Sequence, residues 1–116
     1  VEWIAADVTT ITLPENGFDI WHDRAVFHFL TEPADRAAYV SQVMRAVKPG
    51  GHVIVSTFGP RGPTQCSGLP VMRYSPDSLH DEFGAAFRLI EHDEEEHRTP
   101  GGAMQHFISC RCLKLN

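Results

Sequence analysis

The chain has 116 residues, with 10 basic and 15 acidic side chains that give a formal net charge of −5. This length predicts a single domain over residues 1–116 that can bury a core of its own. The acidic balance, with a pI near 5.7, excludes a general nucleic-acid binder, which would carry a basic stripe. No apolar run reaches the roughly 17–25 residues of a membrane span, so we expect no membrane contact.

The three cysteines, Cys66, Cys110 and Cys112, are an odd number in a chain that shows no secretory signal. This count favours reduced thiols and a cytoplasmic protein over a disulfide framework. Cys110 and Cys112 would share one face of a strand. A zinc site would need two more ligands, such as Cys66 and His106, at a spacing that no common zinc motif has. We therefore expect small buried side chains here and no metal.

The first half of the chain predicts three strands and two helical segments. The chain opens at Val1 with an apolar run, so Val1–Ala6 reads as a strand of a longer protein. After turn residues that end at Gly17, Phe18–Trp21 is a second strand. The apolar residues of Arg24–Leu30 are too dense for an exposed strand and favour a short helical turn.

A longer helix is predicted next, with Thr31 as its N-cap and Pro33 in its first turn. Pro49-Gly50-Gly51 then stops the helix. Val53–Val55 is β-branched without alternation, which is typical of a strand buried on both faces of a parallel sheet. The buried face of the helix is set by apolar residues at i, i+3, i+4 and i+7, namely Val40, Val43, Met44 and Val47.

The second half begins with a long Gly/Pro loop, Gly59–Tyr74. Loops of this length are more often functional than idle in a compact domain. A helix follows, capped by Ser75-Pro76 and ended by Gly84, with Leu79 and Phe83 one turn apart.

Two terminal strands complete the pattern, Phe87–His92 and Met104–Leu115. The acidic run Asp93–Glu96, flanked by His92 and His97, is expected at a solvated hairpin tip, not at a metal. Alternating strands and helices indicate an α/β domain with a mainly parallel sheet and an antiparallel terminal hairpin.

The order of these motifs resembles the second half of class I S-adenosylmethionine-dependent methyltransferases. In that family a strand carrying Phe-Asp, here Phe18-Asp19, is followed by a helix and then by Lys-Pro-Gly-Gly before the next strand, here Lys48–Gly51. Ala6-Asp7-Val8 also fits, as does the ending. The resemblance covers essentially the whole chain and implies a Rossmann-like sheet with a small-molecule methyl acceptor.

The family's Gly-rich turn and the acid that binds the cofactor ribose would precede Val1. The resemblance therefore implies that the intact protein uses S-adenosylmethionine and that this chain alone binds none. By resemblance, Asp7 and Val8 contact the adenine. The alternative for Asp7 is a carboxylate that caps a turn.

Ligands of such sheets bind beyond the carboxyl ends of the strands, where His22, Asp23 and Arg24 follow Phe18–Trp21. Histidine is the side chain most often used as a general base, which suits His22 to that role, and Asp23 either orients His22 or pairs with Arg24. By the same placement Asp23 contacts the cofactor. The alternative is a structural Asp–Arg pair beside a solvated histidine.

Substrate contacts are expected from His28, Arg73 and Tyr74. The alternatives are a partly buried helix histidine for His28 and ordinary loop packing for the other two. Cys66, in the same loop, is expected to pack without a functional role.

Two functions from different classes follow. The chain is either part of a small-molecule methyltransferase or a non-catalytic α/β module that self-associates and binds no cofactor. In the class I strand order, Val1–Ala6 lies apart from Phe18–Trp21, so the latter keeps an unpaired edge. An open edge is a template for pairing with another chain. We therefore expect a homodimer through this edge, unless Val1–Ala6 folds back to cover it.

Overall fold

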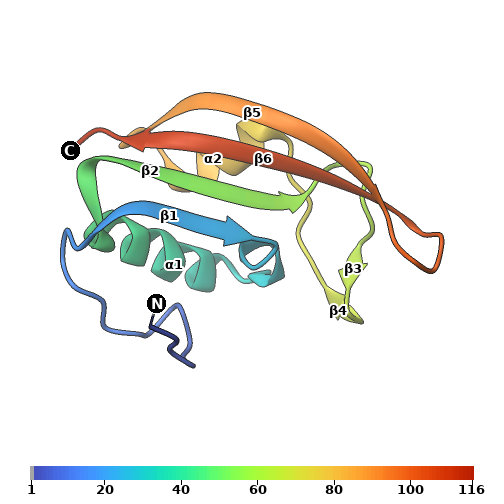
Figure 1. The fold of residues 1–116 in the computed structure, drawn as a ribbon, viewed down its shortest axis with the longest axis horizontal. Coiled ribbons are helices and arrows are strands. Elements are labelled where there is room, and N and C mark those ends of the chain that lie inside the picture. The colour runs from blue at the N-terminus through green and yellow to red at the C-terminus, as the bar shows by residue number, and fades with distance from the viewer. Residues whose placement is uncertain (1) are drawn as a thin grey trace.

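A computed structural model describes residues 2–116, which form a four-stranded sheet in the order β1-β2-β6-β5 (Figure 1). The strands are β1 (Phe18–Arg24), β2 (Val47–Phe58), β5 (Phe87–Arg98) and β6 (Met104–Lys114). β1 and β2 are parallel, whereas β6 is antiparallel to both of its neighbours, β2 and β5. Three strands therefore point one way and only β6 points the other, which confirms the predicted fold class.

The helices cover one face of this sheet. Helix α1 (Pro33–Ala46) and helix α2 (Pro76–Phe83) lie on the same side, and the 3-10 turn η1 (Phe27–Phe29) follows β1 directly (Figure 1). Within residues 2–116 no helix packs on the other face, which we call the open face. The core between helices and sheet includes Phe27, Tyr39, Val43, Val53, Val55, Leu79, Phe83, Phe87 and Ile108.

Proline decides where α1 begins and ends. The predicted N-cap Thr31 is wrong, because Glu32 occupies that position in extended conformation and makes no side-chain capping bond. Pro33 excludes the helical region for the residue before it, which places the helix start at Pro33 itself. Pro49 acts likewise on Lys48, so α1 ends at Ala46 and Val47 already begins β2.

Helix α2 begins and ends where its capping residues, Ser75 and Gly84, predicted. The Ser75 hydroxyl accepts the Ser78 amide at 3.1 Å, and the Ser78 hydroxyl accepts the Ser75 amide at 2.9 Å. Gly84, at φ 83°, ends the helix, and this left-handed conformation favours glycine. The side chains of Leu79 and Phe83 are buried, as predicted.

The first predicted strand is wrong as far as the structure describes it. Residues 2–6 form no strand and are exposed, and Val1 lies outside the described residues. A strand exists only where another strand pairs with it, and residues 2–6 pair neither with β1 nor with any other strand. The alternative of a fold-back that covers β1 is therefore absent in residues 2–6. The segment lies away from the sheet (Figure 1) and is fixed at Ile11, whose carbonyl accepts the Gln42 side chain of α1.

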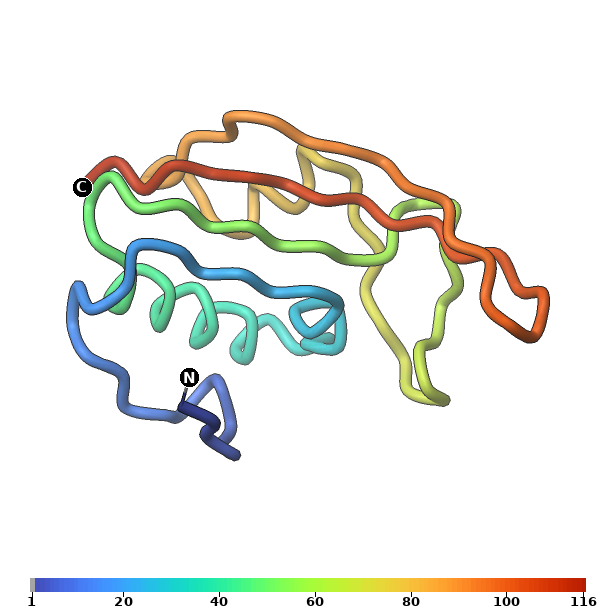
Figure 2. Tube along the Cα trace, viewed as in Figure 1, coloured from blue at the N-terminus to red at the C-terminus, as the bar shows by residue number. Residues whose placement is uncertain are grey.

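Residues 59–74, predicted as a loop, contain a small hairpin of β3 (Gln65–Cys66) and β4 (Leu69–Pro70). We call residues 59–74 the arm. Ser67 and Gly68 at its tip have φ angles of 52° and 78°, as a tight two-residue hairpin turn requires. The arm projects from the end of the sheet where β2 ends (Figure 2). Leu69 at its tip is 58% exposed.

β5 is longer than the predicted strand Phe87–His92, whereas β6 nearly matches the predicted strand Met104–Leu115. β5 runs on to Arg98, so the acidic run Asp93–Glu96 lies within an exposed strand and not at the hairpin tip. Cys110 and Cys112 face the helices as buried free thiols, as expected, and burial raises the pKa of Cys110 to about 12 and that of Cys112 to about 11.

Residues 2–116 contain neither a metal-binding cluster nor a membrane-spanning helix. No group of three or more histidine, cysteine or acidic side chains is arranged to hold a metal ion. No helix in this range has the length and apolar character needed to cross a membrane.

Candidate functional site

The turn that leaves β1 is built around the carboxylate of Asp23. Its Oδ1 accepts the Val26 amide at 2.9 Å, and its Oδ2 accepts the Phe27 amide at 3.0 Å. Oδ2 also accepts the Tyr39 hydroxyl of α1. Both oxygens are thus used, and the side chain is only 5% exposed. Asp23 shapes the loop at the carboxyl edge of the sheet, where α/β folds bind their ligands.

The same turn holds a strained residue. Ala25 has φ 62°, a left-handed conformation that costs a non-glycine residue roughly 1–3 kcal/mol. Its amide donates to the carbonyl of Ser56 on β2 at 2.8 Å. The bonds to Asp23 and Ser56 fix this conformation from both sides. Strained backbone that several surrounding contacts hold in place is often found at binding sites.

Asp23 belongs to a buried chain of hydrogen bonds. Trp21 Nε1 donates to the Tyr39 hydroxyl at 2.9 Å, and that hydroxyl donates to Asp23. Burial raises the pKa of Asp23, and the hydrogen bonds from Tyr39 and from the turn amides partly offset the rise. Burial also raises the pKa of Tyr39, further increased by the Asp23 charge. This network is a positioning device beneath the turn.

His22 and Arg24 lie on the other side of β1. Successive strand residues alternate between faces, so the two side chains are on the open face while Asp23 points toward α1. Among residues 2–116 Asp23 forms no hydrogen bond or ion pair with either of them. Both interactions that the sequence allowed for Asp23 are therefore absent, because consecutive positions in a strand cannot share a face.

His22 and Arg24 line a pocket of about 370 Å³ on the open face. Its floor includes Ser56 of β2 and Ser109 of β6, whose hydroxyls are 3.1 Å apart. The sequence analysis missed the other polar residues of this pocket, which come from β5: Asp93, Glu95 and His97. Alternate residues of a strand share one face, so Asp93, Glu95 and His97 could have been placed together. That inference required knowing that β5 continues beyond His92. The pocket presents both charge signs close to the carboxyl edge.

His28 is placed behind the turn and not in the pocket. Its side chain is fully buried between Phe29 and Phe58, and Nδ1 accepts the Phe58 amide at 3.1 Å. Burial lowers the pKa of His28 to about 4, so the ring is neutral at pH 7. Since Nδ1 accepts, Nε2 carries the proton, and within residues 2–116 this buried N–H has no acceptor.

Arg73 and Tyr74 hold the arm against the body of the domain. Arg73 Nη1 donates to the carbonyls of Pro60 and Gly62, each at 3.2 Å, and so joins the two ends of the arm. The Tyr74 amide donates to the Phe58 carbonyl at 3.0 Å. Its hydroxyl is buried without a hydrogen-bond partner in residues 2–116, and burial raises the Tyr74 pKa to about 12. These contacts match the packing alternative.

Asp7 forms a turn at the surface. Its Oδ1 accepts the amide of Thr9 at 2.9 Å and the Thr9 hydroxyl at 2.7 Å, and the latter bond lowers the pKa of Asp7. This is the capping geometry that the sequence offered as the alternative. Val8 packs against the core cluster.

The residues described do not complete an S-adenosylmethionine site. The ammonium group and ribose hydroxyls of this cofactor need acceptors, which carboxylates supply in nucleotide-binding folds. At the turn the acid is Asp23, and both of its oxygens are already used. No Gly-rich turn joins a strand to a helix in residues 2–116. We therefore derive no reaction step through the cofactor from this chain alone.

Comparison with known proteins agrees with the sheet topology. Residues 1–55 match the family described as "Methyltransferase domain". The chain is 29% identical over 107 residues to a phosphoethanolamine N-methyltransferase of Triticum aestivum, a match that covers 91% of this chain and 18% of that protein.

Solved structures share the fold at low sequence identity. A SAM-dependent methyltransferase of Methanosarcina mazei superposes with a TM-score of 0.74 at 15% identity, covering 95% of this chain and 65% of that one. The N-methyltransferase NodS of Bradyrhizobium japonicum, in complex with S-adenosyl-L-homocysteine, gives a TM-score of 0.75 at 13% identity, covering 98% of this chain and 54% of that one. The chain thus spans less than two-thirds of the length of these proteins.

The strand order and the parallel pairing of β1 with β2 are those of a Rossmann-like sheet, the fold of these solved methyltransferases. In sequence and in fold, this chain resembles class I S-adenosylmethionine-dependent methyltransferases.

Proposed function

We propose that this chain forms the acceptor side of a methyltransferase that transfers the methyl group of S-adenosylmethionine to a small molecule. The observation that carries the proposal is the strained Ala25 turn, held by Asp23 at the carboxyl edge of two parallel strands. The similarity to the phosphoethanolamine N-methyltransferase of Triticum aestivum supports a small-molecule acceptor.

Within this proposal His22 removes a proton from the acceptor, and Asp23 positions the turn beside it. His22 is exposed and lies in a pocket with Arg24 and with acidic residues of β5. Arg24 suits an anionic group of the acceptor, and the β5 carboxylates suit a cationic amine. Methyl transfer from a sulfonium mainly requires alignment of the nucleophile with the methyl group, which a rigid turn provides.

The test is methyl transfer to a panel of small amines by the full-length protein, including any sequence that precedes residue 1. His22→Asn should lower kcat by about 10²-fold or more at unchanged fold, as expected for loss of a general base. The matched control is His52→Asn, since His52 also lies on the open face but opposite Ile20, outside the pocket. Equal activity of both variants would remove His22 from the mechanism, and no turnover of S-adenosylmethionine with any acceptor would overturn the function.

A second prediction concerns the cofactor. We expect the 116-residue chain alone to bind S-adenosylmethionine weakly or not at all, because it lacks free acceptors for the ribose and ammonium groups. Each lost charged hydrogen bond costs ~1.5–3 kcal/mol, and two such losses lower the affinity by a factor of about 10² or more. Calorimetric titration measures this directly. Micromolar binding by the chain alone would contradict the expectation.

The alternative function, a self-associating module, is favoured by one observation. The outer edge of β1 pairs with no strand in residues 2–116, and its apolar residues Phe18 and Ile20 are 39% and 60% exposed. We propose a homodimer in which this edge pairs with its copy. Sedimentation should show a dimer at micromolar concentration, and Ile20→Lys, which places a charge on the edge, should give a monomer with an unchanged circular dichroism spectrum. A monomeric wild-type chain would overturn the dimer.

A further inference from the structure

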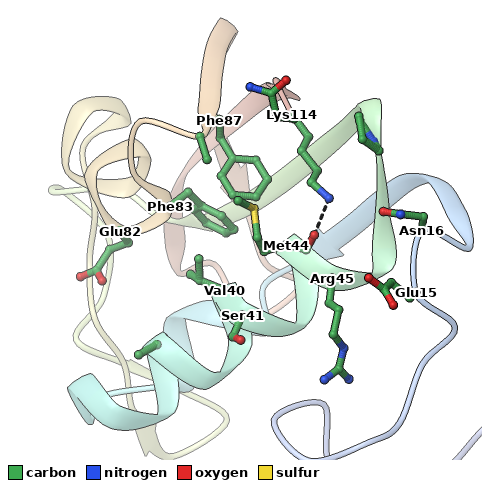
Figure 3. A pocket seen from close by; sticks show the side chains of 14 residues that line it. Glu15, Asn16, Val40, Ser41, Met44, Arg45, Glu82, Phe83, Phe87 and Lys114 are labelled. Atoms are coloured by element: carbon green, nitrogen blue, oxygen red, sulfur yellow. Dashed lines mark hydrogen bonds between the residues drawn. The ribbon is translucent and has the colours of Figure 1, made fainter.

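A groove lies at the end of the molecule opposite to the candidate site. It runs between α1 and α2 near the amino ends of β1 and β2, and encloses about 710 Å³ (Figure 3). This volume lies within the range of about 300–1,000 Å³ typical of small-molecule pockets. Its apolar wall is formed by Val40 and Met44 of α1, by Phe83 at the end of α2 and by Phe87 at the start of β5. Met44 is 37% exposed at this surface.

Lys114 brings a buried positive charge to this groove. It is the last residue of β6, its side chain faces the helices, and only 3% of it is exposed. Its ammonium donates to the carbonyl of Met44 (Figure 3). It also donates to the carbonyl of Val47, the residue that follows α1. These bonds satisfy carbonyls that a helix end otherwise leaves free, and the negative end of the helix dipole favours a cation there.

The two carbonyls leave one N–H of the Lys114 ammonium without an acceptor in residues 2–116. The group has three N–H donors, and only these two acceptors are found among residues 2–116. In the same range no carboxylate lies within 4.0 Å of it. A buried cation without a counter-ion is unfavourable, and an anion that reaches it gains a charge-assisted hydrogen bond.

The other charged groups around the groove leave this positive charge uncompensated. Glu82 is already paired with Arg36 at 3.1 Å, so it is not free to neutralise Lys114. Arg45 adds a second cation at the rim, where its guanidinium bonds Gln42 and no other side chain of residues 2–116. The other polar groups of the rim include Glu15 and the last residue, Asn116, and neither lies within 4.0 Å of the Lys114 ammonium as an ion-pair partner. The groove therefore combines an apolar wall with a positive floor.

We infer that this groove binds a small amphiphile, namely a carboxylate with a medium-length alkyl tail. The carboxylate accepts the third N–H of Lys114, and the tail lies over Met44, Phe83 and Phe87. The inference does not depend on methyl transfer, because the groove and the turn at Asp23 are at opposite ends of β1 and β2. It assigns the chain a second ligand site that is separate from its reaction.

The test is titration of the chain with decanoate, below its micelle concentration, against 1-decanol as the uncharged probe. Calorimetry gives the affinities, and amide chemical shifts locate the site. Decanoate should bind about tenfold or more tightly than decanol, a ratio that corresponds to ~1.4 kcal/mol, with shifts confined to α1, α2 and the end of β6. Equal affinities, or shifts elsewhere, would overturn the inference.

Three variants separate the head and the tail of the ligand. Lys114→Met removes the charge and keeps an unbranched side chain one atom shorter, so it should abolish the preference for decanoate while decanol still binds. Met44→Glu, at an exposed position, should weaken both probes. The matched control is Lys48→Met, which removes an exposed lysine paired with Asp19 at 3.3 Å, outside the groove, and should change neither affinity. If Lys114→Met does not fold, Met44→Glu still decides, since an unchanged decanoate affinity in that variant contradicts the site.

Discussion

Replacement of Tyr39 by Phe tests the buried network that supports the turn at the carboxyl edge. The change removes one hydroxyl that accepts from Trp21 Nε1 at 2.9 Å and donates to Asp23. Loss of a hydrogen bond to a carboxylate costs ~1.5–3 kcal/mol, and loss of a neutral one ~0.5–1.5 kcal/mol. Trp21 is only partly buried, so water can satisfy its N–H in part. We therefore expect Tyr39→Phe to lower the free energy of unfolding by about 2–4 kcal/mol.

The control is Tyr74→Phe. Tyr74 is also a buried tyrosine of the same core, 3% exposed, but its hydroxyl has no partner among residues 2–116. Removing an unsatisfied buried hydroxyl leaves no group unpaired, so this variant should stay within about 0.5 kcal/mol of the wild type or be more stable. The two changes delete the same atom from the same residue type, and only the hydrogen bonds differ.

Urea denaturation followed by tryptophan fluorescence measures both variants. A loss of about 3 kcal/mol lowers the midpoint by roughly 1–2 M for the slopes typical of small proteins. The loss from Tyr39→Phe should also be larger at neutral pH than in acid, because the Tyr39 hydrogen bond lowers the pKa of Asp23 and so favours its ionised form. A loss equal to that of Tyr74→Phe, or one independent of pH, would refute the reasoning.

Two further predictions concern single residues. Because burial raises the folded-state pKa of Asp23 above its usual 3.8, its stabilising contribution is fully present below pH 3.8 and is lost as the pH rises through the raised value. Asn does not titrate, so the stability of Asp23→Asn should not depend on this ionisation. The difference in free energy of unfolding between wild type and variant should therefore decrease as the pH rises. An increase would contradict the raised pKa of Asp23. A side chain on Gly59 would overlap the His106 ring, so Gly59→Ala should destabilise the fold by ~1–3 kcal/mol. Gly101→Ala, whose nearest contact is 4.0 Å away, should be neutral, and equal unfolding midpoints for the two would refute the overlap.

The elements that the sequence predicted well are those whose local signals also determine their ends. Ser75 and Gly84 bound α2 because a cap and a left-handed residue act within one turn of the chain. The two prolines of α1 also act locally, but they exclude helix at the residue before them. This restriction moved the helix start from the expected Thr31 to Pro33 and its end from Pro49 to Ala46.

The elements that the sequence predicted poorly depend on partners far away along the chain. Residues 2–6 have the apolar composition of a strand, but no strand of residues 2–116 pairs with them. β5 continues through the acidic run because β6 pairs with it as far as Arg98. The candidate site follows the same logic. The position of His22, Asp23 and Arg24 at a strand end was predictable, whereas the partner of Asp23 was not, because Tyr39 lies on the next helix.

The strand order β1-β2-β6-β5 has a consequence for how fast the chain folds. β5 and β6 are joined by a short turn, so this hairpin can form on the microsecond scale typical of local pairing. The β2–β6 ladder instead joins Ser56 to Ser109 and Val53 to Cys112, so the arm, α2 and β5 must all be enclosed before it closes. Closing this long segment reduces the conformational entropy of the chain before the stabilising contacts between β2 and β6 have formed. We therefore expect the hairpin to be structured in the folding transition state and the docking of β2 onto β6 to limit the rate, so that core substitutions in β2 slow folding more than exposed substitutions in β1.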